Sequence, residues 1–244
     1  MPTFRHRQQT SRGFDSFTIT DDFESVAFHV FPEFPRLMAV SMQHDSVFVD
    51  LRPIFDALAQ IFLEPETLGA ADAIPIAAQT LLEVGKNLPD NLKVRLSQIV
   101  DKKPATDLEL SQSYAKLFLD VATTAIPLCE SAWANSEHLL SRRAQFECRD
   151  AYQDAGLELA GGSVVPEDHL GLMLGFLAVM ALRDDVQIGM DFYKKHLQLL
   201  IPAISQAIDK QKEGAGAYAD VAVILDGIVA VLKDSEKSES KQKQ

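Results

Sequence analysis

The chain has 244 residues, of which 47% are hydrophobic and 24% charged, so it is long and apolar enough to fold around a buried core. Its 35 Asp and Glu residues outnumber its 23 Lys and Arg residues, which gives a net charge of −12. This charge argues against binding nucleic acid through its phosphates and favours basic or neutral partners.

Cysteine usage and hydropathy exclude further classes of protein. Cys129 and Cys148 lack the spacing of a CxxC or Cys/His metal motif, so we expect neither a disulfide scaffold nor a metal site. The longest apolar run, Leu170 to Leu182, falls short of the roughly 18 residues that a membrane-spanning helix needs. No apolar stretch follows the basic N-terminal residues as it would in a secretory signal. The sequence therefore predicts a cytoplasmic protein without a membrane span.

Composition divides the chain into three parts. Residues 1–45 begin with a polar stretch and include Pro32 and Pro35, and we interpret them as an N-terminal extension of uncertain structure. Residues 46–232 form the predicted helical domain. Residues 233–244 contain no apolar residue and are predicted to be a solvated, disordered tail.

Helical periodicity dominates the predicted domain. Between Val47 and Phe62 apolar residues recur at three- and four-residue steps, with Pro53 marking either a helix start or a kink. The same criterion predicts further helices over residues 77–88, 91–100, 107–119, 131–155, 166–182, 186–207 and 216–232. Strand signals are weak, since no sustained period-two run and no Asn-Gly or Asp-Gly turn occur. We therefore expect an all-α fold, a single-domain bundle of about eight to ten helices.

Two predicted helix starts carry recognisable signals. Asp107 is the expected N-cap of helix 107–119, because its carboxylate can accept free N–H groups of the first turn. Pro166 is the expected first residue of helix 166–182, where a missing N–H costs nothing, and Glu167 and Asp168 would then lie at the positive end of the helix dipole.

Catalytic motifs are not supported by the spacing of the reactive residues. Ser131, His169 and Asp168 contain the residue types of a nucleophilic triad, but chain neighbours in a helix diverge by roughly 100°, so Asp168 is badly placed to orient His169. No GxSxG elbow accompanies Ser131. The Gly161–Gly162 pair is not followed by the Lys-Ser/Thr of a phosphate loop. We therefore predict no catalytic residues.

Three segments stand out for their order and spacing. Tyr114-Ala-Lys-Leu-Phe118 is followed by Ile126-Pro-Leu-Cys-Glu-Ser-Ala-Trp133, and Val165-Pro-Glu-Asp-His-Leu170 then opens an apolar helix. These segments resemble the Y-x-x-L-F, P-x-x-E-S-x-[WY] and E-P-x-D-H motifs of the TorD/DmsD/NarJ group of redox-enzyme maturation chaperones. A later segment, Phe192–Leu197, resembles that family's F-x-x-x-H-L motif. The resemblance covers roughly residues 46–232 and implies a TorD-like helical fold.

The resemblance implies a function that is not enzymatic. Members of this group bind the twin-arginine signal peptide, or the apo-form, of a molybdenum- and iron–sulfur-containing oxidoreductase subunit. They keep it in the cytoplasm until its cofactor is inserted and its partner subunits are assembled, which prevents premature export. For this chain the resemblance therefore implies a client subunit as partner, no cofactor of its own, and a monomer or homodimer.

A twin-arginine peptide presents two guanidinium groups beside an apolar stretch, so its acceptor needs carboxylates next to an apolar groove between helices. The predicted peptide-binding residues are Tyr114, Phe118, Glu130, Ser131, Trp133, Pro166, Glu167, Asp168, His169 and Leu172. Purely structural roles compete with this interpretation. The aromatic residues can belong to the core, the acidic residues can serve helix N-termini, and His169 can hydrogen-bond a loop.

Two other functions stay open at this point. Val165 replaces the Glu that the family usually carries, and the N-terminal extension has no counterpart, which keeps an all-α adaptor or dimerisation module as an alternative. A hydrolase would require His169 to meet a carboxylate other than that of Asp168.

Overall fold

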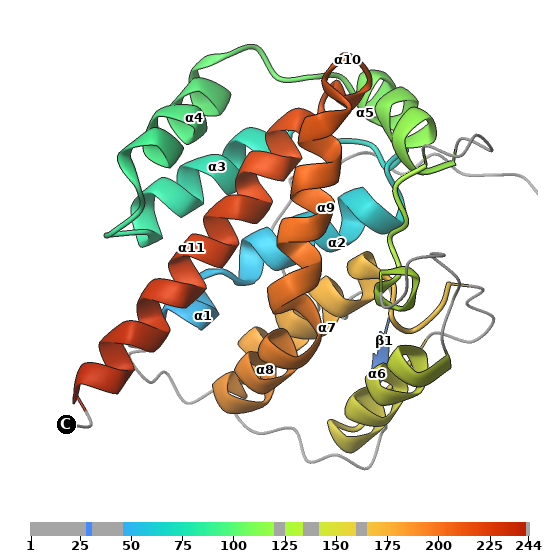
Figure 1. The fold of residues 1–244 in the computed structure, drawn as a ribbon, viewed down its shortest axis with the longest axis vertical. Coiled ribbons are helices and arrows are strands. Elements are labelled where there is room, and N and C mark those ends of the chain that lie inside the picture. Colours follow the sequence, from blue (N-terminus) through green and yellow to red (C-terminus); the bar gives the residue numbers. More distant parts are fainter. Residues whose placement is uncertain (1–27, 31–45, 120–124, 134–141, 160–164, 243–244) are drawn as a thin grey trace, which may run out of the picture.

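The computed structural model describes residues 28–30, 46–119, 125–133, 142–159 and 165–242. Within these ranges the fold is all-α, with nine α-helices of seven or more residues (Figure 1), and the predicted helical bundle is confirmed. The α-helices are α1 (Val47–Asp50), α2 (Arg52–Leu63), α3 (Ala73–Val84), α4 (Asp90–Asp101), α5 (Asp107–Tyr114), α6 (Arg142–Asp154), α7 (Leu170–Arg183), α8 (Val186–Phe192), α9 (Gln198–Lys210), α10 (Lys212–Ala215) and α11 (Tyr218–Gln242).

Three short helical turns and two strands complete the described elements. The strands β1 (Phe28–Val30) and β2 (Leu157–Leu159) pair antiparallel, with Phe28 opposite Leu159. The turns are the π-helical η1 (Ala115–Leu119) and η3 (Tyr193–Leu197) and the 3-10 turn η2 (Glu130–Ala132). Apart from β1, the predicted N-terminal extension lies outside the described residues. No helix in the described ranges combines the length and the apolar character needed to cross a lipid bilayer.

Helix α7 forms the centre of the core. Every residue from Leu170 to Ala181 is buried, so this helix is apolar all round rather than on one face. It packs most extensively on α2, and Gly171 lies at this contact, where a Cβ would approach Leu63 Cγ to 2.7 Å. Pro53 lies in the first turn of α2, so the prediction of a helix start there is the correct alternative.

Helix α11 extends along the bundle against α9, α3 and α4 (Figure 1). It continues from Lys233 to Gln242, where composition predicts a disordered tail, and this difference has a local cause. Asn87 Nδ2 donates a 2.8 Å hydrogen bond to Asp234, and Lys194 forms a 3.3 Å ion pair with Glu236. Polar residues of the tail therefore have partners on the bundle, which composition does not reveal.

An aromatic cluster joins α2, α5, η1 and α11. The Phe118 ring lies 5.0 Å from the Tyr218 ring and 5.1 Å from the Tyr114 ring, measured between centroids. Both tyrosine hydroxyls donate hydrogen bonds to backbone carbonyls of α2. Tyr218 donates to Ile61 at 2.8 Å, and Tyr114 donates to Phe62 at 3.3 Å. Such pairs add stabilisation beyond area burial, so this cluster fixes the segment that contains Tyr114 and Phe118.

The N-terminus of α5 differs from its prediction. Thr106, not Asp107, is the N-cap: its Oγ1 accepts the N–H of Glu109 at 3.2 Å, and Glu109 in turn accepts the N–H of Thr106 at 2.7 Å. Asp107 accepts the N–H groups of Gly69 and Ala71 instead. These two backbone bonds lower the pKa of the Asp107 carboxyl and tie α5 to the turn before α3.

Replacing Thr106 by Ala should therefore lower the free energy of unfolding by about 1 kcal/mol, because the capping box loses its side-chain acceptor. Urea denaturation monitored by circular dichroism measures the change. Thr80→Ala is the matched control, since Thr80 is a partly exposed residue inside α3 whose hydroxyl donates to the Ile76 carbonyl. The control should be neutral or slightly stabilising; equal losses in both variants would contradict the assignment of the cap.

Candidate functional site

The second and third motif segments meet in a short antiparallel bridge between Cys129 and His169. The Glu130 N–H donates to the Asp168 carbonyl at 3.0 Å, and the Leu170 N–H donates to the Leu128 carbonyl at 2.8 Å. Residues about 40 positions apart in the sequence thus become neighbours. We call residues 128–131 and 166–170 the bridge site.

Asp168 is fully buried within the bridge site. Its Oδ2 accepts the N–H of Ser131 at 2.8 Å, so it caps the 3-10 turn η2 from a distant part of the chain. Its Oδ1 has no hydrogen-bond partner among the described residues. The prediction that Asp168 serves the N-terminus of its own helix is wrong, because α7 begins only at Leu170 and Asp168 faces η2 instead.

His169 is the N-cap of α7, and its Nδ1 accepts the N–H of Gly171 at 3.2 Å. Accepting this bond requires an unprotonated Nδ1. Burial lowers the pKa of His169 to about 4, so the imidazole is neutral at pH 7. The residue is thereby used as a cap, and Asp168 does not orient it.

Glu167 attaches helix α6 to the bridge site. Glu167 is 9% exposed. Its carboxylate accepts hydrogen bonds from Arg149 Nε at 2.6 Å and from Gln145 Nε2 at 2.5 Å. The Tyr152 hydroxyl donates to the Glu167 carbonyl at 2.7 Å. Burial by itself would raise the pKa of the Glu167 carboxyl, but the bonds from Gln145 and Arg149 and the charge of Arg149 outweigh it and lower that pKa.

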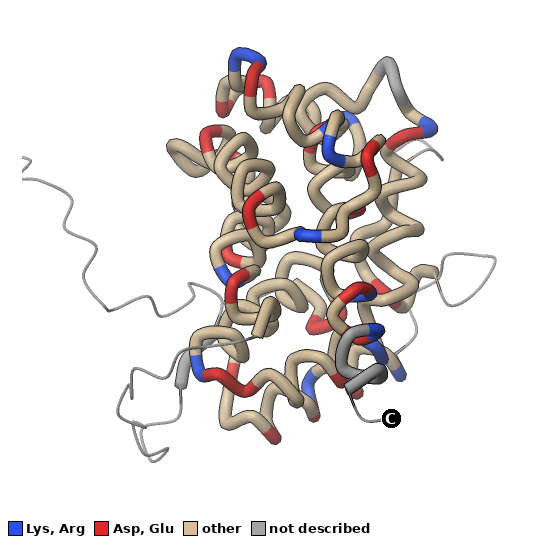
Figure 2. The backbone as a smooth tube through the Cα atoms, turned by 90° about the vertical axis from the view of Figure 1, so that its left-hand side faces the viewer, with Lys and Arg blue, Asp and Glu red and all other residues tan. Residues whose placement is uncertain are grey.

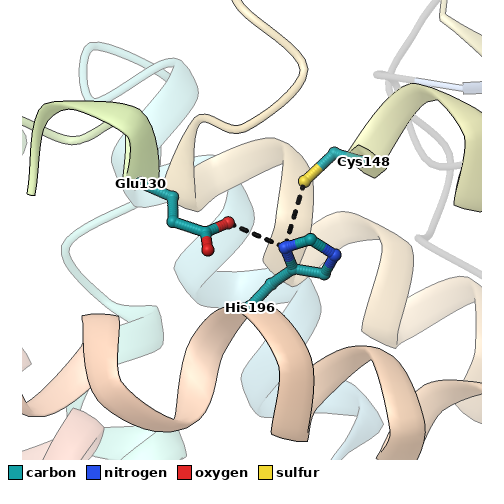
Figure 3. A group of neighbouring side chains, drawn as sticks. All are labelled: Glu130, Cys148 and His196. Atoms are coloured by element: carbon teal, nitrogen blue, oxygen red, sulfur yellow. Dashed lines mark hydrogen bonds and ion pairs between the residues drawn. The ribbon is translucent and has the colours of Figure 1, made fainter. Parts of the chain in front are cut away.

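The third carboxylate of the bridge site, that of Glu130, lies close to a histidine and a cysteine (Figure 3). Glu130 Oε2 lies 2.7 Å from His196 Nδ1, and Cys148 Sγ lies 3.8 Å from the same nitrogen. His196 and Cys148 are buried, whereas the Glu130 side chain is 25% exposed. His196 comes from η3 and Cys148 from α6, so three elements converge here.

This arrangement is not that of a nucleophilic enzyme. In a triad the nucleophile and the orienting acid use opposite nitrogens of the imidazole, whereas Glu130 and Cys148 both face Nδ1. Burial also raises the pKa of the Cys148 thiol far above its usual value, which opposes formation of a thiolate. The other imidazole nitrogen, His196 Nε2, is buried and has no hydrogen-bond partner among the described residues. It therefore contacts no nucleophile that the imidazole could activate.

The remaining predicted site residues lie around the bridge site or in the aromatic cluster. Trp133 is half-buried and donates from Nε1 to the Pro127 carbonyl at 2.9 Å. Pro166 is partly buried and its carbonyl accepts the His169 N–H. Leu172 and Ser131 are buried. Tyr114 and Phe118 are half-buried against the core, in the aromatic cluster.

Charge does not gather on one part of the backbone. Figure 2 shows acidic residues from one end of the bundle to the other, with fewer basic residues interspersed. The bridge site itself contains three carboxylates, those of Glu130, Glu167 and Asp168, and each has a hydrogen-bond partner within the protein. Spacing of the motifs predicted these carboxylates, but not their partners.

Arg149, Gln145, Tyr152, Cys148 and His196 belong to the site and were missed as site residues. Four of them share α6, within residues 145–152 of a predicted helix that carries no motif. Only His196 had a sequence signal, because it lies in the segment Phe192–Leu197 that resembles a family motif. That segment contains a π-helical turn, a feature that often accompanies functional sites.

Replacing Asp168 by Ala should lower the free energy of unfolding by about 1–3 kcal/mol, because the buried Ser131 N–H loses its acceptor. Asp168→Asn keeps an acceptor oxygen and should recover part of the loss. Denaturant unfolding measures both, with Asp150→Ala on the exposed side of α6 as the control. A control loss equal to that of Asp168→Ala would refute the capping role.

Glu167 also predicts a pH dependence of stability. Its pKa is depressed below the ordinary 4.5 in the folded protein, so its contribution is present above pH 4.5 and is lost as pH falls through the lowered pKa. At pH 7 the free energy of unfolding of the wild type should exceed that of Glu167→Gln by about 1–2 kcal/mol. Urea unfolding between pH 3 and pH 7 should show this difference shrinking below pH 4.5. A difference independent of pH would mean that the charge of Glu167 does not stabilise the fold.

Comparison with known proteins places the chain in a family. A family model described as nitrate reductase delta subunit matches residues 84–210, more than half of the chain. The matched range contains the whole bridge site together with Cys148 and His196. A search of curated proteins gave no match. The chain belongs to the nitrate reductase delta subunit family, the NarJ/TorD-type maturation chaperones that its motifs resemble.

Proposed function

We propose that this protein is a cytoplasmic maturation chaperone that binds the twin-arginine signal peptide, or the apo-form, of a molybdoenzyme-type oxidoreductase subunit. Binding would delay export until the cofactor is inserted and the partner subunits are assembled. Membership of the delta subunit family supports the general role of a redox-enzyme maturation chaperone. The contacts in the bridge site support the more specific proposal.

The observation that carries this proposal is the pairing of bridge-site carboxylates with cationic or imidazole groups. Glu167 holds the guanidinium of Arg149, and Glu130 holds the imidazole of His196. An incoming arginine would exchange one charge-assisted hydrogen bond for another, so neither carboxylate would be left unpaired at any stage. Such an exchange is close to neutral in energy, which suits a partner that must later be released.

Apolar contact would then supply the net affinity. Phe146 on α6 is 45% exposed, and the Arg149 guanidinium lies 5.4 Å from its ring centroid. Displacement of Arg149 from Glu167 by a client arginine leaves this aromatic surface available to the apolar part of a signal peptide. Trp133, which is half-buried and follows Glu130 by three residues, can extend the same surface.

The ten predicted residues accordingly receive three kinds of role in the proposal. Glu130, Glu167 and Trp133 contact the peptide. Asp168, Ser131, Pro166 and His169 hold the bridge in shape, since Asp168 and Ser131 are buried and His169 is a cap. Tyr114, Phe118 and Leu172 support the surrounding helices from the core.

A binding experiment with matched peptides tests the proposal. A fluorescently labelled twin-arginine signal peptide from the host should bind the full chain, and its Arg-Arg→Lys-Lys counterpart should bind about tenfold more weakly, because lysine cannot form the bidentate pair. Glu167→Gln should weaken binding of the arginine peptide, whereas Glu158→Gln on the exposed position of β2 should not. Fluorescence anisotropy at low and physiological salt measures each affinity.

Equal affinity for both peptides would refute a guanidinium-specific site. Failure of the chain to bind either the peptide or the co-expressed apo-subunit would favour an all-α adaptor or dimerisation module instead.

A further inference from the structure

Three metal-ligating side chains converge at the edge of the bridge site, and the proposed function assigns no role to their combination or to Cys148. The ligand atoms of Glu130, Cys148 and His196 all lie within 4.8 Å of one another, and the three side chains point toward a common centre (Figure 3). We call these three residues the Glu-Cys-His cluster. They come from η2, α6 and η3, which are 18 and 48 residues apart in the chain, so no spacing motif could predict them.

We propose that the Glu-Cys-His cluster binds one divalent transition metal ion of the zinc class, through Glu130 Oε, Cys148 Sγ and His196 Nδ1. A thiolate, an imidazole and a carboxylate together form a donor set that suits zinc, and a purely carboxylate set would have suited magnesium or calcium. Three protein ligands leave the fourth tetrahedral position for water or for a group from a bound partner.

The distances are close to those that such an ion imposes. Ligand bonds of about 2.0–2.3 Å in a tetrahedron place donor atoms about 3.4–3.6 Å apart. Cys148 Sγ lies 3.8 Å from His196 Nδ1, near this spacing, whereas Glu130 Oε2 is closer, at 2.7 Å. The carboxylate must therefore withdraw slightly. Because the Glu130 side chain is 25% exposed and the other two are buried, it is the one ligand with room to move.

Charge and proton balance favour the metal-bound state of a buried cluster. The bond from Nδ1 to the Glu130 carboxylate places the imidazole proton on Nδ1, and metal binding moves this proton to Nε2. The charge of the bound ion stabilises the Cys148 thiolate that burial alone opposes, so the thiol loses its proton to solvent as the metal binds. One carboxylate and one thiolate then neutralise the two positive charges of the ion, so no net charge is buried.

Binding would also link structural elements that carry the function. Glu130 belongs to η2 in the bridge site, Cys148 to α6 beside the residues that hold Glu167, and His196 to the π-helical turn η3. A metal ion would join these three elements through direct bonds. The inference rests on the positions of these atoms and does not depend on signal-peptide binding.

Cobalt(II) is the probe for the first experiment, because a cysteine ligand gives it a sulfur-to-metal charge-transfer absorption and a tetrahedral site gives it intense visible bands. The full chain, freed of metal with a chelator, should show both features at one equivalent, and added zinc should abolish them. Cys148→Ser should lose the charge-transfer absorption. Cys129→Ser is the matched control and should retain it, since Cys129 is not part of the cluster.

A second variant distinguishes loss of metal binding from loss of the fold. Glu130→Gln alters the partly exposed ligand and should preserve helical content by circular dichroism, while zinc affinity should fall at least tenfold, since changes beyond the direct ligands already cost about 10–100-fold. Absence of the cobalt spectrum from the wild-type chain, an unchanged spectrum in Cys148→Ser, or an unchanged affinity in Glu130→Gln would each overturn the proposal.

Discussion

The hydrogen bonds between residues 128–130 and 168–170 are the constraint on which the rest of the site depends. They join two loops across the start of α7, and the buried carboxylate of Asp168 completes them by capping η2. A buried carboxylate is costly unless it is hydrogen-bonded, so this pairing is specific in a way that apolar packing is not. Glu130, Glu167 and His169 take their positions from it.

Within this frame the carboxylates are engaged by the protein itself. Glu167 holds α6 through Gln145 and Arg149, and Glu130 holds η3 through His196. In the proposed function, the same bonds would stabilise the free protein and would exchange when a cationic partner binds. The bridge site would then combine a rigid backbone with side chains whose partners can be replaced, which is the combination that reversible recognition needs.

Two of the family-like segments contain π-helical turns. One follows Tyr114 and includes Phe118, and the other includes His196. A π turn inserts an extra residue into a helix and alters which side chains face the core. In this protein one turn contributes Phe118 to the aromatic cluster, and the other contributes His196 to the Glu-Cys-His cluster. Both segments are thus locally irregular where they meet the rest of the bundle.

The sequence by itself determined the helical class, most helix positions and the segments that form the bridge site, because apolar periodicity and local motifs are written in neighbouring residues. It misplaced the cap of α5 because the local Thr-x-x-Glu capping box of Thr106 and Glu109 was passed over in favour of Asp107. It misplaced the start of α7 and the end of α11 because Asp168 and Asp234 bond to groups far away in the sequence. Only the tertiary structure decided that Arg149 pairs with Glu167 and that Cys148 meets His196. Contacts between residues tens of positions apart depend on how the helices pack, and a single sequence does not encode them in any spacing.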